Sequence, residues 1–348
     1  MWCSGRFVVA DFYQQSAEEQ AERMLDLART AVEHWDIEAG DIALIKYREN
    51  AVFSVTDTSG HRYALRIHRS EYHSDSELLS ELQWMDALLH KGVGTPPVIP
   101  SRSGSLFVIV EHPAIPEPRQ VDLLGWLHGD PVGAIEEAQS RNGDEVADLF
   151  RRIGKLAAEV HSKTADWSLP EGFARHAWDA EGILGDDPFW GRFLDLAALD
   201  DQTRALLVRA CDKARQDLAN FGMTEQNYGL IHADFVPENL LQRGEDLLLI
   251  DFDDAGFGWH MFELATALYF HVDDPNLDLM RNAILEGYRT ARALPESDWE
   301  LLPLFLFLRS LTYLGWVHTR HETETARSLT PMFIDRTQML ALNYLNES

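Results

Sequence analysis

One stretch of the sequence carries side chains whose types and spacing suit phosphoryl transfer. Asp234 and Asn239 lie five residues apart in the segment His232-Ala233-Asp234-Phe235-Val236-Pro237-Glu238-Asn239, and Asp251 comes 12 residues later at the end of an apolar run. Carboxylate and amide oxygens are the ligands that Mg²⁺ prefers, and it completes its shell with water and substrate phosphates. Phosphoryl transfer also needs a carboxylate that orients an acceptor hydroxyl and takes its proton.

The pattern His-x-Asp-x-x-x-x-Asn is weak when it stands alone. Asp and Asn favour turns, so Asp234 and Asn239 could simply form a capped turn before a hairpin. That interpretation does not account for Asp251 at the end of the next apolar strand. The sequence contains no Gly-x-Ser-x-Gly, His-Glu-x-x-His or P-loop pattern, which argues against the corresponding hydrolase, zinc-protease and nucleotidase chemistries.

The elements that must position these residues fall into two halves. In the first half, alternating apolar residues and helical periodicity predict a helix after Ser16, a meander of three strands, a second helix and two further strands. From the first strand of the meander onward, the predicted ranges are Ile42–Tyr47, Val52–Asp57, Arg62–His68, Ser76–His90, Leu106–Val110 and Gln120–Leu127. After Gly129 the chain is mainly helical, apart from a predicted hairpin at Leu240–Gln242 and Leu247–Asp251.

The segment from His232 to Asn239, together with Asp251, resembles the corresponding segment of the aminoglycoside phosphotransferase and choline kinase family of the protein-kinase-like superfamily. The resemblance implies an α+β, two-lobed fold with a small antiparallel-sheet N-lobe at residues 1–125 and a mainly helical C-lobe at residues 126–348. It implies ATP and Mg²⁺ as cofactors and Asp234 as the catalytic carboxylate, with His232 bracing the loop. Asn239 and Asp251 would hold the metal, and Asp253 could contact a second cation.

The same resemblance implies nucleotide-binding residues in the first half. Arg66 occupies the strand position where most of the family has Lys, and Glu81 would pair with it and help to position the phosphates. Asn50 would donate to phosphate from the turn Arg48-Glu49-Asn50-Ala51. For the adenine, the family position points to the backbone of Gly125, Trp126 and Leu127, with Leu124 lining the pocket.

Structural alternatives remain for several of these residues. Arg66 could be a strand-surface arginine paired with Glu81 across the sheet. Packing roles are favoured for the histidines His68, His161 and His260 and for Arg309 and Trp316. The segment between Ser168 and Phe193 is rich in Trp, Gly, Asp and Pro, and for Trp178, Asp179 and Trp190 substrate contact and loop packing are equally favoured. Glu263 replaces the family's usual Asp, and we assign it no catalytic role.

The acceptor is less closely defined than the reaction. We expect a hydroxyl of a small molecule of the aminoglycoside, amino alcohol or homoserine type. The run Asp251-Phe252-Asp253-Asp254-Ala255 also resembles bacterial stress response kinase A and its relatives, which makes a Ser/Thr protein kinase the alternative. The Arg at position 66 motivates a third hypothesis of another class, a catalytically impaired nucleotide-binding module.

The composition and net charge limit the binding partners and the cell compartment that we expect. The 348 residues include 57 acidic and 30 basic side chains, for a formal charge of −27. Such a field opposes binding to nucleic acid or an anionic membrane and weakly favours a cationic acceptor. We expect a cytoplasmic protein with reduced Cys3 and Cys211, since no signal peptide or long spanning run is recognisable. The sequence does not indicate an oligomeric state. Bound Mg²⁺ and Arg66 would have to reverse the field locally where the nucleotide binds.

Overall fold

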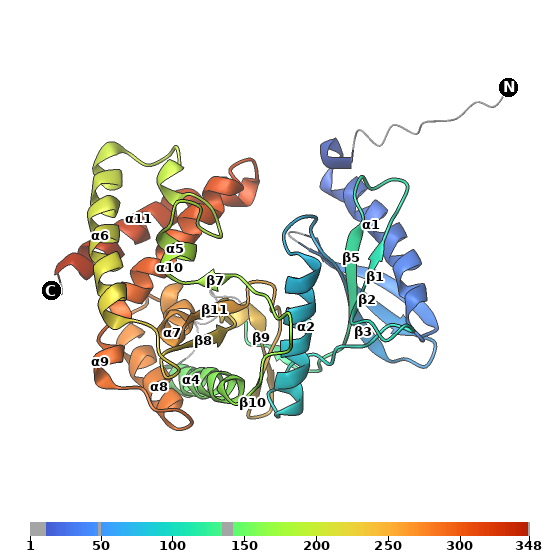
Figure 1. Cartoon of the computed structure of the whole chain (residues 1–348), viewed down its shortest axis with the longest axis horizontal. Coiled ribbons are helices and arrows are strands. Elements are labelled where there is room, and N and C mark those ends of the chain that lie inside the picture. Colours follow the sequence, from blue (N-terminus) through green and yellow to red (C-terminus); the bar gives the residue numbers. More distant parts are fainter. Residues whose placement is uncertain (1–11, 48–49, 134–141, 347–348) are drawn as a thin grey trace. The chain divides into compact units, whose positions relative to one another are not determined.

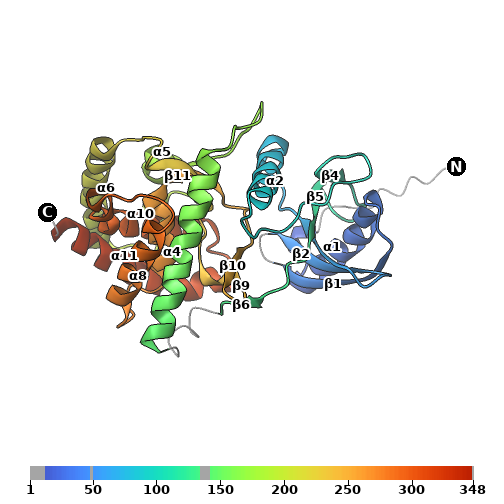
Figure 2. The ribbon, with the colours of Figure 1, turned by 90° about the horizontal axis from the view of Figure 1, so that it is seen from below.

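The computed structural model describes residues 12–47, 50–133 and 142–346. The chain divides into two compact units, Met1–His128 with Pro170–Ala174, and Gly129–Leu169 with Arg175–Ser348 (Figures 1 and 2). Arg48 and Glu49 of the predicted phosphate turn, and Cys3, lie outside the described residues. Cys211 is buried, and burial raises the pKa of its thiol to about 12, so it is an inert core residue.

The first unit contains an antiparallel sheet of five strands in the order β1-β2-β3-β5-β4. Their bounds are β1 Ala39–Tyr47, β2 Ala51–Asp57, β3 Arg62–Ile67, β4 Phe107–Val110 and β5 Arg119–Gly125. All five predicted strands are therefore present, and their ends differ from the predicted ones by at most three residues. The register places Arg66 of β3 directly opposite Asp122 of β5.

Two helices cover the two faces of this sheet. Helix α1 (Ala17–Ala31) and helix α2 (Asp75–His90) each begin with a capping box, at Ser16 with Glu19 and at Ser74 with Glu77. The core beneath α1 includes Leu65 and Ile67. Because neighbouring strand residues point to opposite faces, Arg66 faces the other side, where α2 lies (Figure 1).

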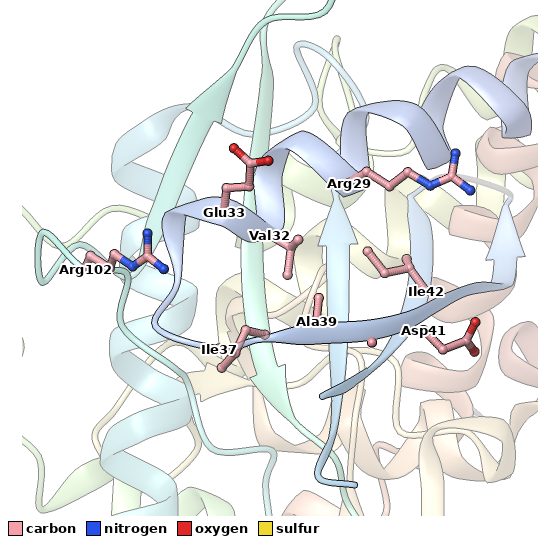
Figure 3. A pocket seen from close by; sticks show the side chains of 9 residues that line it. Arg29, Val32, Glu33, Ile37, Ala39, Asp41, Ile42 and Arg102 are labelled. Atoms are coloured by element: carbon pink, nitrogen blue, oxygen red, sulfur yellow. The ribbon is translucent and has the colours of Figure 1, made fainter. Parts of the chain in front are cut away.

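A hollow opens on the first unit between the end of α1 and the start of β1 (Figure 3). Arg29 and Glu33 line it from the helical side, and Asp41 and Ile42 line it from the strand. It contains none of the residues that the sequence assigns to nucleotide, metal or acceptor, so it has no part in the expected chemistry.

The second unit is mainly helical. Its longer helices are α4 Gly143–Ala165, α6 Asp201–Phe221, α7 His260–Tyr269, α8 Leu277–Arg289, α10 Leu302–Thr319 and α11 Glu324–Asn346. The short helices are α5 Ala180–Leu184 and α9 Glu296–Trp299. Helices α4 and α8 pack closely because glycines meet at their crossing: a Cβ on Gly154 would lie 2.0 Å from the Ile284 carbonyl oxygen, and one on Gly287 would lie 1.8 Å from that of Arg151.

Two three-stranded sheets position the polar loops of this unit. One has the order β10-β9-β6, and the other has the order β7-β11-β8. Their strands are β6 Asp130–Pro131, β7 Ala177–Trp178, β8 Tyr228–Ile231, β9 Leu240–Arg243, β10 Asp246–Leu249 and β11 Gly256–Trp259. The predicted hairpin is confirmed as β9 and β10. The ends of β8 and β10 deliver His232 and Asp251 into the loops that come after them.

One segment, Glu296–Thr319, is long and apolar enough by composition to cross a membrane, and 78% of its apolar window is buried inside the protein. That burial is typical of the core helix of a globular protein. The segment comprises α9 and α10, and α10 packs against α7 and α11.

Candidate functional site

Asp234 lies at the centre of the polar loops of the second unit. Its Oδ2 accepts a hydrogen bond from Nδ2 of Asn239 at 2.7 Å, and its Oδ1 accepts one from Nη2 of Arg309 at 3.0 Å. Nδ2 of Asn239 also donates to the Asp234 carbonyl oxygen at 2.9 Å. The Asp234 side chain is 25% exposed. The carboxylate is thus fixed in direction from both sides while part of it stays accessible.

Burial and neighbouring charged groups shift the pKa of Asp234. Removal from water raises the pKa of Asp234 above its ordinary value, and Arg309 opposes this shift; Asp254 and Asp251 add to it. These two carboxylates therefore act on Asp234 electrostatically, in the same direction as burial. A carboxylate with a raised pKa is a better proton acceptor once it is ionised.

His232 connects the loop of Asp234 to the strand that carries Asp251. Its Nδ1 accepts the Asp234 backbone N–H at 3.3 Å, so its Nε2 carries the proton and donates to the Ile250 carbonyl oxygen at 3.1 Å. Burial lowers the pKa of His232 to about 4, which keeps the ring neutral at pH 7 and fits this tautomer. The geometry is that of a brace between two loops.

Glu263 holds the same loop through two hydrogen bonds to its backbone. Its two carboxylate oxygens accept the backbone N–H groups of His232 and Ala233, both at 2.7 Å. Glu263 is fully buried, and burial raises its pKa although His232 and these hydrogen bonds oppose the shift. The longer side chain therefore reaches both amides, and its role is to hold the loop rather than to react.

Two of the residues predicted to hold metal, Asn239 and Asp251, lie at one end of the β9–β10 hairpin. Asn239 precedes β9 and Ile250 comes directly after β10, and the Ile250 N–H donates to the Asn239 carbonyl oxygen at 3.0 Å. The Asn239 amide nitrogen is turned toward Asp234, which leaves its side-chain oxygen as the atom that could bind a metal. Asp251 is exposed and has a left-handed backbone with φ of 66°, whereas Asp253 is buried. An amide and carboxylate oxygen set of this kind fits a hard divalent cation.

In the first unit, Arg66 forms a buried network with Glu81 and Asp122. Its Nε donates to Asp122 Oδ1 at 3.0 Å, and its Nη2 donates to Asp122 Oδ2 at 2.7 Å and to Glu81 Oε1 at 2.9 Å. Nε2 of His68 lies 2.7 Å from Asp122 Oδ2. Burial alone would raise the pKa of Asp122, but Arg66 and His68 lower it, so the group is an anion. Arg66 is buried, and the surface-arginine alternative is wrong.

The other predicted nucleotide contacts have defined backbone partners. Asn50 Oδ1 accepts the Arg69 N–H at 2.9 Å, which leaves its side-chain amide as the donor. The N–H of Gly125 donates to the Pro97 carbonyl oxygen at 2.7 Å, and that of Trp126 donates to the Arg62 carbonyl oxygen at 3.2 Å. These two N–H groups are therefore not available to adenine, and the predicted backbone contact rests on carbonyl oxygens and Leu127. Leu124 is buried in the sheet.

The polar contacts of three residues at these clusters were not predicted from the sequence. Asp122 stands inside the apolar strand Val121–Leu124, and Arg309 stands alone in the apolar helix α10. A single charged residue within an apolar run is usually buried and paired with another polar group. This pattern could have identified both Asp122 and Arg309 as members of buried networks. Arg175 lies just before β7 and donates hydrogen bonds to backbone carbonyl oxygens. No pattern in the sequence indicates these contacts.

The segment from 168 to 193 has mainly a packing role. Trp178 is fully buried, Asp179 caps α5, and the Trp190 indole N–H donates to Asp254 Oδ1 at 3.1 Å. Nη2 of Arg309 also donates to the hydroxyl of Tyr313 at 2.8 Å, and its guanidinium lies over the Trp190 and Tyr313 rings. Arg309 is therefore packed, as expected, and it also binds Asp234.

Comparison with known proteins identifies the family of this chain. Residues 43–300 match the model of the phosphotransferase enzyme family. Amicoumacin kinase of Bacillus subtilis is 24% identical over 276 residues, 76% of each chain. A homoserine kinase of a Chelativorans species is 29% identical over 269 residues, 74% of this chain and 72% of the relative.

Solved structures lead to the same family. A microcompartment-associated aminopropanol kinase is 34% identical, with a TM-score of 0.80 over 92% of this chain and 97% of the other. An amicoumacin kinase bound to AMP-PNP and Ca²⁺ shares the fold, with 19% identity and a TM-score of 0.73 over 93% and 96% of the two chains. The relatives act on small molecules and do not favour the protein-kinase alternative, while the narrower likeness to stress response kinase A stays a prediction. The α+β, protein-kinase-like fold is confirmed, and the chain belongs to the phosphotransferase enzyme family as a small-molecule kinase that phosphorylates a hydroxyl group.

Proposed function

We propose that this kinase uses ATP and Mg²⁺ to phosphorylate the hydroxyl of a small amino alcohol. The observation that carries the reaction is the Asp234 carboxylate, which Asn239 and Arg309 fix in direction and which remains 25% exposed. The observation that carries the acceptor class is the 34% identity, over nearly the whole chain, with an aminopropanol kinase. The charge of −27 also favours a cationic acceptor over an anionic one.

Metal and phosphate binding fall to different residues of the chain. Asn239 and Asp251 would hold Mg²⁺, with Asp253 nearby in sequence, and the bound ion would neutralise phosphate charge. Arg66, oriented by Glu81 and Asp122, would position the phosphates, and Asn50 would donate its side-chain N–H to them. A cytoplasmic location, where ATP and Mg²⁺ are both present, fits this role.

Asp234 would accept a hydrogen bond from the acceptor hydroxyl and orient its oxygen toward the γ-phosphorus. The new oxygen–phosphorus bond forms as the bond to the β,γ-bridging oxygen breaks, ADP leaves, and the hydroxyl proton passes to Asp234. His232 and Glu263 touch neither reactant in this scheme. They keep the Asp234 loop in place.

An acceptor screen tests the proposal. ATP consumption would be measured with 1-amino-2-propanol, ethanolamine, choline, homoserine, an aminoglycoside and a protein acceptor. Propane-1,2-diol lacks the amine and isopropylamine lacks the hydroxyl, so this pair separates recognition of the cation from the reaction itself. We expect turnover with amino alcohols, weaker turnover with the diol and none with isopropylamine. Turnover with homoserine, an aminoglycoside or protein but not with amino alcohols would overturn the acceptor class.

A further inference from the structure

The short segment at residues 175–178 binds the backbone of the loop that carries the acidic residues. This loop, Asp251–Ala255, joins β10 to β11. Nε of Arg175 donates to the Ala255 carbonyl oxygen at 2.5 Å, and its Nη2 donates to the Asp253 carbonyl oxygen at 2.6 Å. One guanidinium therefore spans the loop from its middle to its end.

The carbonyl between these two is bound as well. The Trp178 indole N–H donates to the Asp254 carbonyl oxygen at 2.8 Å, and Nε2 of His176 lies 3.1 Å from the same oxygen. Three consecutive carbonyls of the Asp251–Ala255 loop are thus turned toward residues 175–178. Peptide planes that are fixed in this way restrict the directions available to the side chains of Asp253 and Asp254. Nη2 of Arg175 also donates to the Phe252 carbonyl oxygen at 3.4 Å, which extends the contact to the residue after Asp251.

The sheet topology explains why these residues meet. Strand β7 pairs in parallel with β11, with Ala177 opposite Phe257, so the residues just before β7 lie beside those just before β11. The Phe257 N–H donates to the His176 carbonyl oxygen at 3.0 Å. Position 256 must be glycine for this approach, because a Cβ there would lie 2.6 Å from the same oxygen.

We propose that Arg175 is a positioning residue for the cation site. The Asp251–Ala255 loop carries three aspartates, Asp251, Asp253 and Asp254, whose mutual repulsion opposes a fixed loop in the absence of a cation. The guanidinium supplies positive charge on the carbonyl side and a rigid two-pronged donor that sets the loop's path. Outer-sphere groups of this kind orient metal ligands. The inference rests on the proposed function, because it takes Asp251 as a ligand of Mg²⁺.

The test measures binding rather than turnover. AMP-PNP binding to wild-type protein, Arg175→Gln and Arg175→Lys would be followed by calorimetry across a Mg²⁺ titration. Loss of an outer-sphere partner typically costs about 10- to 100-fold in metal affinity. We expect Arg175→Gln to need that much more Mg²⁺ for half-maximal nucleotide binding, and to approach wild-type binding when Mg²⁺ is saturating. Arg175→Lys keeps the charge but loses the fork, so it should recover part of the loss.

Arg215→Gln is the matched control. Nη2 of Arg215 donates to the Leu184 carbonyl oxygen at 2.7 Å, so this variant removes another arginine-to-carbonyl contact from the same unit. Hydrogen exchange of the metal-free protein gives a second readout, in which Arg175→Gln should accelerate exchange of the amides at 255 and 257 while Arg215→Gln leaves them unchanged.

The outcomes are distinct. A wild-type protein whose nucleotide binding is independent of Mg²⁺ would overturn the proposed metal site and the role of Arg175 with it. A wild-type protein that depends on Mg²⁺, together with Arg175→Gln of unchanged Mg²⁺ dependence, would overturn the inference alone. If Arg175→Gln does not fold, Arg175→Lys decides by the same comparison.

Discussion

Glu263 accepts the backbone N–H of Ala233 at 2.7 Å, at a point where Ala233 has a left-handed backbone with φ of 62°. A non-glycine residue in this region costs about 1–2 kcal/mol, so the conformation persists only where the surroundings hold it. The buried carboxylate of Glu263 stabilises this conformation, because it also accepts the backbone N–H of His232. The direction of Asp234, the next residue, therefore depends on a side chain of α7.

Replacing Glu263 with Gln should damage both stability and turnover. The Gln amide offers one oxygen and one nitrogen to two N–H donors, so one donor loses its acceptor in a buried place. A buried donor without its partner costs about 1–3 kcal/mol, and we expect urea unfolding to show a loss of that size. Exposed Glu245→Gln is the control, and a Glu263→Gln protein as stable and active as this control would exclude the anchoring role.

Arg66 and Asp122 should behave as one unit. The guanidinium binds both oxygens of Asp122, a geometry that Lys cannot reproduce. Arg66→Lys and Asp122→Asn should each destabilise the protein by about 1–3 kcal/mol. In a double-mutant cycle the pair should show a coupling within the range of about 0.5–3 kcal/mol that contacting residues give. Additive losses in urea unfolding would show that the fork does not contribute.

The sequence predicted the elements well because periodicity and capping are local. Ser16 and Glu19 set the start of α1 as predicted, and α2 begins at Asp75, one residue before the predicted start. The pair of Arg66 with Glu81 was also predicted, and the structure shows it at 2.9 Å. The second half, by contrast, is predicted only as mainly helical, and in helix α11 Pro331 interrupts the periodicity that would mark the bounds of the helix.

The interactions that sequence reasoning missed are those set by long-range packing. Asp122 meets Arg66 only because β3 and β5 pair in one register, and Arg309 reaches Asp234 across 75 positions of sequence. Arg175 binds backbone carbonyl oxygens, which every residue has. The residue types at positions 253 to 255 therefore do not indicate the contact.

Acid should destabilise this protein through its buried histidines. Burial lowers the pKa of both His232 and His271 to about 4, below the ordinary value of about 6.5. Between about pH 4 and 6.5 the unfolded chain binds more protons than the folded one. The free energy of unfolding therefore falls as the pH falls through this range, and the contribution of these histidines is fully present above it. Each such histidine contributes a slope of up to about 1.4 kcal/mol per pH unit.

His271 allows this to be tested outside the site. Its ring packs edge-on against Phe150, and its Nε2 has no hydrogen-bond partner among the described residues. His271→Phe should therefore reduce the slope of unfolding free energy between about pH 4 and 6.5 by one histidine's contribution. An unchanged slope in urea titrations at several pH values would show that His271 is not held neutral.

Asp251→Asn should weaken Mg²⁺-dependent nucleotide binding while the fold is kept, because Asp251 is exposed and the two side chains have the same size. The measurement is AMP-PNP affinity with and without Mg²⁺, and the exposed Asp246→Asn on the same hairpin is the control. An affinity equal to that of the control in Mg²⁺ would remove Asp251 from the metal site.

In the proposed reaction Asp234 accepts the proton of the acceptor hydroxyl. Asp234→Asn keeps the size of the side chain and can keep a contact with Arg309, but it cannot take the proton. The decisive measurement is kcat with 1-amino-2-propanol or the best acceptor from the screen, beside AMP-PNP affinity in Mg²⁺. We expect kcat to fall by about 10²- to 10⁴-fold while nucleotide affinity is retained. An Asp234→Asn protein with wild-type kcat would contradict it.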